Sequence, residues 1–261
     1  MAYQFLEYEV QNGIASLRLN RPPVNALGRQ LVAELTAAAR QINSDLTSRD
    51  IRVVVLSSAG RHFCAGADLK ERLATPEEEV EGVVQALRGA VQAVADLEVP
   101  SIAAVHGSAL GGGMELALAA DMRVLSDTAI LGLRETALAI IPGAGGTQRL
   151  PRLIGYAAAM EWIATARTFT AAECLAQGLA NRVVPEAELH ATAMQLAGMI
   201  AANGPLAVRA AKEAMRRGGD MPLREGLAYE MECYRRIIPT RDRREALQAF
   251  SEKRPPVFKG E

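Results

Sequence analysis

The most constraining stretch of the sequence is SIAAVHGSALGGGMELALAAD, residues 101–121, in which almost every residue is small or apolar. Its first part predicts a short buried strand that ends near His106, and its last part predicts a helix that begins around Met114. Three consecutive glycines lie between them, so backbone N–H groups at the helix start can approach a ligand without obstruction by side chains. A tight turn packed against a neighbouring helix explains the same glycines, and the pattern alone leaves both interpretations open.

A single glutamate, Glu115, stands in this apolar run and falls in the first turn of the predicted helix. The helix dipole favours a negative charge there, but the helix offers no polar face on which a solvated carboxylate would lie. A second glutamate, Glu135, lies beside another apolar run and precedes Pro142 and a glycine-rich turn. If the two carboxylates are buried and close together, burial and mutual repulsion move their pKa values upward and apart, which suits one as a base and the other as an acid.

The segment HFCAGADLK, residues 62–70, follows the predicted strand IRVVVLSS. Small residues at Ala65, Gly66 and Ala67 leave the backbone free to donate hydrogen bonds. Two N–H groups from separate segments are what the oxygen of a thioester enolate requires. Asp68 is predicted to begin a turn or a helix.

The rest of the chain alternates strand and helix patterns. FLEYEV and IASLRL predict paired strands across the Asn12-Gly13 turn, and residues 28–43 and 76–97 have the apolar spacing of helices. This alternation predicts an α/β fold with parallel strands up to about Val184. A capping box from Thr170 to Glu173 and a helix start at Pro205 indicate a mainly helical C-terminal portion.

Composition disfavours several classes of protein. The 29 basic and 30 acidic residues give a net charge of −1, so nucleic acid is not the expected partner. No apolar run is long enough to span a bilayer, and the first residues lack a secretory signal pattern, so we expect no membrane partner. We expect a cytoplasmic protein, or an organelle-matrix protein if a transit peptide has been removed. The separated cysteines and histidines lack metal-type spacing, so no metal is expected.

The CAGAD, GGGxE and PxxGG stretches, in this order, resemble the enoyl-CoA hydratase/isomerase family, also called the crotonase family. The resemblance covers nearly the whole chain, from NRPPVNAL to EKRPPVFKGE. It implies a crotonase-like spiral of β-β-α units, an oxyanion hole formed by the N–H groups of Ala67 and Gly112, and catalytic carboxylates at Glu115 and Glu135. Water would add across the double bond of a trans-2-enoyl-CoA thioester, with CoA as part of the substrate and no separate cofactor.

Within this family, FCAGADLKER and ETALAIIPGAGGTQRLPRLIG resemble the methylglutaconyl-CoA hydratase branch of leucine degradation, although general short-chain hydratases share much of both. Some members of that branch bind RNA through a lysine-lined helix. The matching segment here, NALGRQLVAELTAAARQIN, contains no lysine, so RNA binding is not expected. The resemblance also implies that residues 71–98 line the acyl chain, without indicating whether a second substrate carboxylate is recognised.

The resemblance further suggests a set of residues that bind CoA or substrate: Ala65, Asp68, Leu69, Lys70, Tyr234 and Lys253. Of these, Lys253, with Tyr234, would reach the CoA of an adjacent subunit, although a surface charge explains Lys253 nearly as well. Residues 1–190 are predicted to form the β/α spiral core with the CoA and catalytic site. Residues 191–261 are predicted to form a helical oligomerisation portion, as in a homotrimer or a dimer of trimers.

A serine hydrolase using His106 and Ser108 is an alternative enzyme class. The position two residues after Ser108 is Leu110, whereas a nucleophile elbow has glycine there, and no aspartate is placed by motif to orient His106. The sequence therefore disfavours this alternative.

Overall fold

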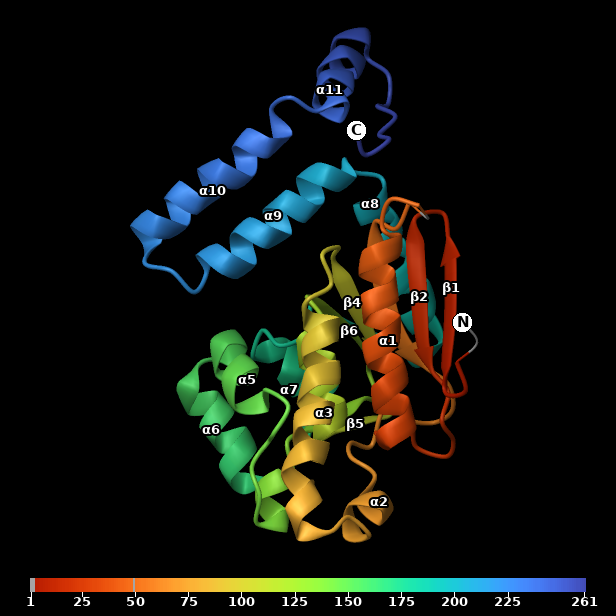
Figure 1. Cartoon of the computed structure of the whole chain (residues 1–261), viewed down its shortest axis with the longest axis vertical. Coiled ribbons are helices and arrows are strands. Elements are labelled where there is room, and N and C mark those ends of the chain that lie inside the picture. The colour runs from red at the N-terminus through yellow and green to blue at the C-terminus, as the bar shows by residue number, and fades with distance from the viewer. Residues whose placement is uncertain (1–2, 49) are drawn as a thin grey trace.

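The larger sheet runs through the centre of the molecule, in a computed structural model that describes residues 3–48 and 50–261 (Figure 1). Its strand order is β1-β2-β3-β4-β6-β9. The bounds are β1 Leu6–Gln11, β2 Ile14–Leu19, β3 Val53–Ser58, β4 Ser101–Val105, β6 Met122–Ser126 and β9 Arg182–Val184. β1 and β2 pair antiparallel across the Asn12-Gly13 turn, and the later neighbours are parallel, as the sequence predicts.

A smaller sheet has the order β5-β7-β8, with β5 at Ser108–Leu110, β7 at Ile130–Gly132 and β8 at Phe169–Thr170. The chain enters it repeatedly. β4 leads to β5 and then to helix α4 (Gly112–Ala119), and β6 leads to β7 and then to the 3-10 helix η1 (Glu135–Leu138). β3 similarly leads to a bridge between Cys64 and Ala109 and then to α2 (Leu69–Leu73). The predicted spiral of β-β-α units is confirmed.

Helices cover both faces of the larger sheet. α1 (Arg29–Asp45) and α3 (Glu77–Ala95) pack against each other on one face, and α8 (Leu189–Ala201) contacts β3, β4 and β6 on the other. Val54 and Leu56 join the core on the first face, whereas Val53 and Val55 join the core beneath α8. Both sets are buried, which explains why β3 has a continuous apolar sequence rather than an alternating one.

Several short helices follow η1, and the sequence predicted the start of one of them, at Thr170. They are α5 (Gly146–Ile154), α6 (Tyr156–Thr165), α7 (Ala171–Ala176), η2 (Glu186–Glu188) and α8. The capping box at the start of α7 is present: Thr170 Oγ1 accepts from the N–H of Glu173, whose carboxylate accepts from the N–H of Thr170. Gly178 follows α7 in a left-handed conformation.

The last helices, α9 (Pro205–Gly218), α10 (Leu223–Ile237) and α11 (Arg241–Glu252), extend away from the spiral (Figure 1). α9 is tied to the core because Lys212 Nζ donates to the carbonyl of Val99 at 2.8 Å and pairs with Asp121 at 2.6 Å. The predicted helical C-terminal portion is confirmed, and the predicted division at residue 190 falls inside α8. Within the described ranges no helix is long and apolar enough to cross a membrane.

Candidate active site

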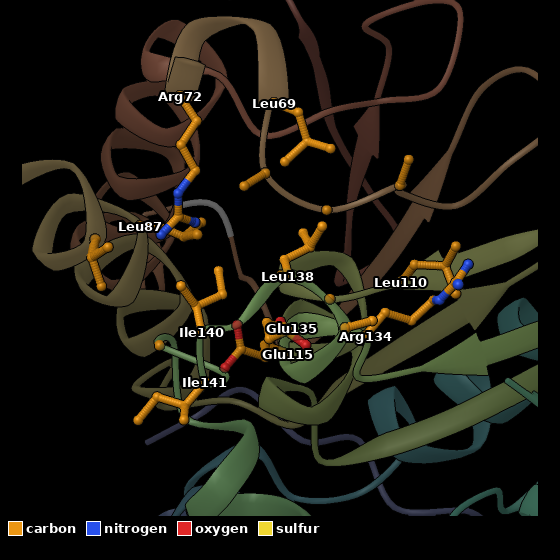
Figure 2. A pocket seen from close by; sticks show the side chains of 18 residues that line it. Leu69, Arg72, Leu87, Leu110, Glu115, Arg134, Glu135, Leu138, Ile140 and Ile141 are labelled. Carbon is orange, nitrogen blue, oxygen red and sulfur yellow. The ribbon is translucent and has the colours of Figure 1, made fainter. Parts of the chain in front are cut away.

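A cavity of about 340 Å³ lies where α2, α3, α4 and η1 approach one another (Figure 2). Most of its wall is apolar, with side chains such as Leu69, Leu87 and Ile140. Both predicted catalytic glutamates line it, as do Ala65, Ala67 and Gly112. Segments as far apart in the sequence as Ala65 and Glu135 therefore meet at one cavity.

The N–H groups of Ala67 and Gly112 lie at neighbouring points of the cavity wall. A Cβ atom placed on Gly112 would be 3.7 Å from the Ala67 nitrogen, which shows how closely the two segments approach. Among the residues that the structure describes, no backbone or side-chain oxygen accepts a hydrogen bond from either N–H group. Because Gly112 is the first residue of α4, its N–H has no partner within the helix. Two free donors thus converge on one region of the cavity.

The glycines before Glu115 have both of the roles that the sequence allows: one borders the cavity, and another packs tightly against a neighbouring segment. Gly112 borders the cavity, whereas Gly113 is a packing position, since a Cβ there would be 2.2 Å from the carbonyl oxygen of Cys64. Gly66 needs a positive φ of 95°, and a Cβ there would be 2.7 Å from the carbonyl oxygen of Leu110. Close approach of the backbones at these points makes the narrow gap between Ala67 and Gly112 possible.

Glu115 is only 1% exposed and projects from the first turns of α4. Its Oε1 atom accepts hydrogen bonds from the N–H groups of Ala144, at 2.7 Å, and Gly146, at 2.8 Å. Burial raises the pKa of Glu115, while these N–H groups and the charge of Arg149 oppose the rise. The helix in which it lies has no polar face, as predicted, and the polar partners come instead from the glycine-rich turn before α5.

Glu135 begins η1 and faces the same cavity as Glu115 (Figure 2). Burial, and then the negative charge of Glu115, raise the pKa of Glu135 from 4.5 to about 7. The charge of Arg72 acts in the opposite direction and is a smaller influence. Its Oε2 atom is buried, and no donor in residues 3–48 or 50–261 reaches it. The Glu115 carboxylate is thus held by two backbone N–H groups. Glu135 has a raised pKa and an oxygen that no described donor reaches.

The residues predicted to bind CoA or substrate fall into different places. Ala65 and Leu69 line the cavity. Asp68 caps α2, accepting from the N–H groups of Lys70 and Glu71, and pairs with Arg21 at 2.7 Å. It therefore starts a helix, as predicted, and does not line the cavity. Lys70 is exposed on α2 and does not line it either.

Tyr234 and Lys253 lie far from the cavity of their own chain. Tyr234 is 59% exposed on α10, and Lys253 is exposed at the end of α11, at the opposite end of the molecule from α2 (Figure 1). Their contact with CoA therefore remains a prediction, and the CoA would have to be bound by an adjacent subunit.

The residues of the proposed hydrolase alternative lie outside the cavity. Neither His106 nor Ser108 lines it, and His106 Nε2 lies 2.9 Å from the carbonyl oxygen of Gly60. This pair is therefore not positioned for chemistry beside the two glutamates.

Sequence patterns missed some of the residues that shape the site. The N–H groups of Ala144 and Gly146, which donate to Glu115, lie in the glycine-rich turn after Pro142. That turn is the sequence feature from which these donors could have been predicted. Two cavity arginines, Arg72 and Arg134, were not predicted, because a single arginine beside a short helix carries no periodic signal. Residues 71–98 contribute Arg72, Val84 and Leu87 to the wall.

Known proteins match this chain over nearly its whole length, including the cavity. The profile described as Enoyl-CoA hydratase/isomerase matches residues 9–261, which include every cavity residue. The chain belongs to this family. A crystal structure of the family, enoyl-CoA hydratase from Bacillus anthracis, is 48% identical and superposes with a TM-score of 0.95, covering 99% of this chain and 100% of that one.

Two family members from mammals are nearly as similar in sequence. Enoyl-CoA hydratase domain-containing protein 2, mitochondrial, of Bos taurus is 47% identical over 255 residues, which cover 95% of this chain and 85% of that protein. Methylglutaconyl-CoA hydratase, mitochondrial, of Homo sapiens is 45% identical over 258 residues, which cover 97% of this chain and 76% of that protein. Relatives with differently named activities thus lie at similar distances from this chain.

Proposed function

We propose that the protein is an enoyl-CoA hydratase, which reversibly adds water across the double bond of a trans-2-enoyl-CoA thioester. The observation that carries the proposal is the meeting of Glu115 and Glu135 in one apolar cavity beside the N–H groups of Ala67 and Gly112, which have no hydrogen-bond acceptor among the described residues. The names of the related proteins support the same chemistry. In this proposal CoA enters as part of the substrate, and no separate cofactor takes part.

The thioester carbonyl oxygen accepts hydrogen bonds from the N–H groups of Ala67 and Gly112. As water adds, negative charge moves onto this oxygen, so the fixed donors stabilise the enolate more than they stabilise the substrate. Each such donor typically contributes about 100- to 1000-fold in rate. Because the donors are backbone groups, side-chain substitutions elsewhere in the cavity leave them in place.

The two glutamates divide the proton transfers. Glu115 is the better candidate for the ionised base, because the N–H groups of Ala144 and Gly146 and the charge of Arg149 favour its carboxylate form. Glu135, with a pKa of about 7, is the better candidate for the acid. Water gives its proton to Glu115 as its oxygen bonds to C3, and Glu135 gives its proton to C2. Both groups line the same cavity, and we propose that they act on one face of the double bond, which makes the addition syn. A proton then returns from Glu115 to Glu135 before the next turnover.

The test is the loss of conjugated enoyl-thioester absorbance with crotonyl-CoA, measured for the wild type and for Glu115→Gln and Glu135→Gln. Removal of a general acid or base is expected to lower kcat by about 100- to 10,000-fold. The exposed Glu9→Gln in β1 is the matched control, since it makes the same chemical change away from the cavity. Full activity in both cavity variants would show that the roles are wrongly assigned.

A methylglutaconyl-CoA hydratase is the second candidate within the same chemistry. It is favoured by the 45% identity to the human enzyme of that name and by a guanidinium in the cavity wall. The same assay with methylglutaconyl-CoA separates the candidates by the ratio of kcat/KM for the two substrates. An isomerase shares the enolate, so 3-enoyl-CoA is included as a third substrate. Non-enzymatic RNA binding remains disfavoured and would require steeply salt-dependent affinity.

The assembly proposed for the enzyme is a homotrimer or a dimer of trimers. Large apolar side chains are exposed along the C-terminal helices, among them Leu223, Leu227 and Phe250, with exposed fractions of 80%, 56% and 85%. Burial of such side chains between copies of the chain would stabilise an oligomer. Sedimentation as a monomer at micromolar concentration would contradict this assembly.

A further inference from the structure

The Glu115 carboxylate depends on a turn that belongs to another part of the chain. Its Oε1 atom accepts from the N–H groups of Ala144 and Gly146, which lie just before α5 and at its first residue. Gly145, between them, has a φ of 113°, a conformation that residues with a side chain rarely adopt. Because both N–H groups point at Glu115, the shape of this turn decides how firmly the carboxylate is held.

Arg149 holds this turn with both its backbone and its side chain. Its N–H donates to the carbonyl oxygen of Gly145 at 2.8 Å, and the same planar peptide unit carries the Gly146 N–H that donates to Glu115. Its half-buried side chain donates from Nη1 to the carbonyl oxygen of Ala144, also at 2.8 Å. The guanidinium lies so close to Gly145 that a Cβ there would collide with it. Two consecutive peptide units of the turn are therefore fixed by one residue.

The other end of the guanidinium is held from outside the cavity. Arg149 Nη2 donates to Gln92 Oε1 of α3 at 2.6 Å, and Gln92 Nε2 donates to Asp96 Oδ1 at 2.9 Å. The same Asp96 oxygen accepts from Arg216 Nη2 of α9 at 3.2 Å. Gln92 is exposed, and neither it nor Arg149 lines the cavity. The position of the guanidinium is thus set by contacts that a substrate in the cavity does not touch.

Arg149 also affects the charge state of the carboxylate. Burial raises the pKa of Glu115, while the N–H groups of the turn and then the positive charge of Arg149 lower it. The negative charge of Glu115 in turn raises the pKa of Glu135, which faces the same cavity. Charged groups on three other helices influence Arg149: Glu115 on α4, Arg88 and Asp96 on α3 and at its end, and Arg216 on α9.

We propose that Arg149 is a positioning residue for the base: it keeps the turn before α5 in the shape that aims two N–H groups at Glu115. Gln92 in turn keeps the guanidinium over the turn. This inference rests on the proposed hydration reaction and names residues outside the cavity on which its base depends. A carboxylate that is already fixed does not have to reorient before it takes a proton from water.

The experiment measures kcat, KM and the pH profile of kcat/KM for crotonyl-CoA hydration. The variants are Arg149→Met, Arg149→Lys and Gln92→Leu. Arg149→Met removes the charge and the hydrogen bonds of the side chain, whereas Arg149→Lys keeps the charge. Gln92→Leu changes an exposed residue and leaves Arg149 in place, so it tests the anchor even if Arg149→Met does not fold. Circular dichroism of each variant checks the fold.

Each change has a matched control on the same helix. Arg152→Met removes an exposed arginine from the last turn of α5, where its side chain donates to the carbonyl oxygen of Gln148. Gln85→Leu removes an exposed glutamine from α3, where its side chain donates to Glu81. Neither control residue donates to the turn before α5, so both are expected to keep the wild-type kcat and pH profile.

Arg149→Met is expected to lower kcat by about 10- to 100-fold, as for a misplaced catalytic group. KM is expected to change little, because Arg149 does not line the cavity. At low pH the rate falls because Glu115 takes up a proton, and loss of the nearby positive charge is expected to move this fall to higher pH by about one unit.

The two other variants separate charge from position. Arg149→Lys is expected to return the low-pH fall towards its wild-type place, because the charge remains. Its kcat is expected to stay low, because an ammonium group lacks the planar fork that reaches both Ala144 and Gln92. Gln92→Leu is expected to lower kcat by about 3- to 10-fold, as for the loss of one hydrogen bond.

Three results would overturn the inference. The first is an Arg149→Met protein with the wild-type kcat and an unmoved fall at low pH. The second is a loss of kcat in Arg152→Met as large as in Arg149→Met. The third is a loss in Gln85→Leu as large as in Gln92→Leu.

Hydrogen exchange separates failure of this inference from failure of the proposed reaction, because it needs no substrate. Mass spectrometry of peptides that span residues 142–150 is expected to show exchange about 10-fold faster in Arg149→Met than in the wild type or Arg152→Met. If no thioester is hydrated yet this difference is present, the reaction is wrong and the hold of Arg149 on the turn stands. If hydration depends on Glu115 but exchange, kcat and pH profile are unchanged in Arg149→Met, the positioning role is wrong and the reaction stands.

Discussion

The replacement Glu135→Gln is expected to stabilise the protein above neutral pH while removing its activity. The pKa of Glu135 is about 7, compared with 4.5 for an ordinary glutamate, because the carboxyl group is buried near Glu115. One pH unit corresponds to about 1.36 kcal/mol, so the whole difference amounts to about 3 kcal/mol. Because the side chain is partly open to solvent, we expect about 1 to 2 kcal/mol.

The sign of the effect depends on pH. Glu135 binds its proton more tightly in the folded than in the unfolded chain, so the wild type loses stability as the pH rises from about 4.5 to about 7. Glutamine does not titrate, and its shape is nearly the same. The stability gain of the variant is therefore expected to be near zero at about pH 4.5 and to reach its maximum above about pH 8.

The measurement is denaturant unfolding of the wild type and Glu135→Gln across this pH range at one protein concentration. Glu9→Gln, which removes an exposed carboxyl group in β1, is the control and should show no such pH-dependent gain. A Glu135→Gln protein that is no more stable than the wild type at any pH would refute the claim that the buried charge destabilises the fold.

Three further predictions concern the rate and the packing. The value of kcat/KM for crotonyl-CoA should fall above about pH 7, because Glu135 must carry a proton to act as the acid. A pH–rate profile that stays flat to about pH 9 would contradict this role. Gly113→Ala should destabilise the protein by at least about 2 kcal/mol, since the new Cβ would lie 2.2 Å from the carbonyl oxygen of Cys64. Gly82→Ala in the exposed part of α3 has open space around it and should stabilise the protein by about 0.5 to 1 kcal/mol, which thermal unfolding of both variants would check.

Much of the fold was predictable because its signals are local. The Asn12-Gly13 turn, the capping box at Thr170 and the apolar strands each depend on neighbouring residues, and each is present in the structure. Glu115 and Glu135 could be singled out for the same reason, since each is a lone acidic residue beside an apolar run.

The remaining features depend on contacts between distant segments, and sequence patterns do not encode these. The donors to Glu115 Oε1 come from residues 29 and 31 positions later in the chain. The direction of Arg72 depends on how Asp68 and Glu71 fasten a five-residue helix, which is too short to show an apolar face. Asp68 belongs to a motif shared with the family, yet its side chain is occupied by α2 and Arg21 rather than by the cavity.

The repeated passage of the chain between the two sheets limits how much of the candidate site a single substitution can change. Consecutive coils deliver Ala67, then Gly112 and Glu115, then Glu135, each just after the chain leaves the smaller sheet. Each coil therefore contributes to the candidate site from an equivalent place. A substitution in one coil can alter a proton donor or a substrate contact while the buried strands and the other coils keep their sequence, so new reactions can arise on this scaffold one component at a time.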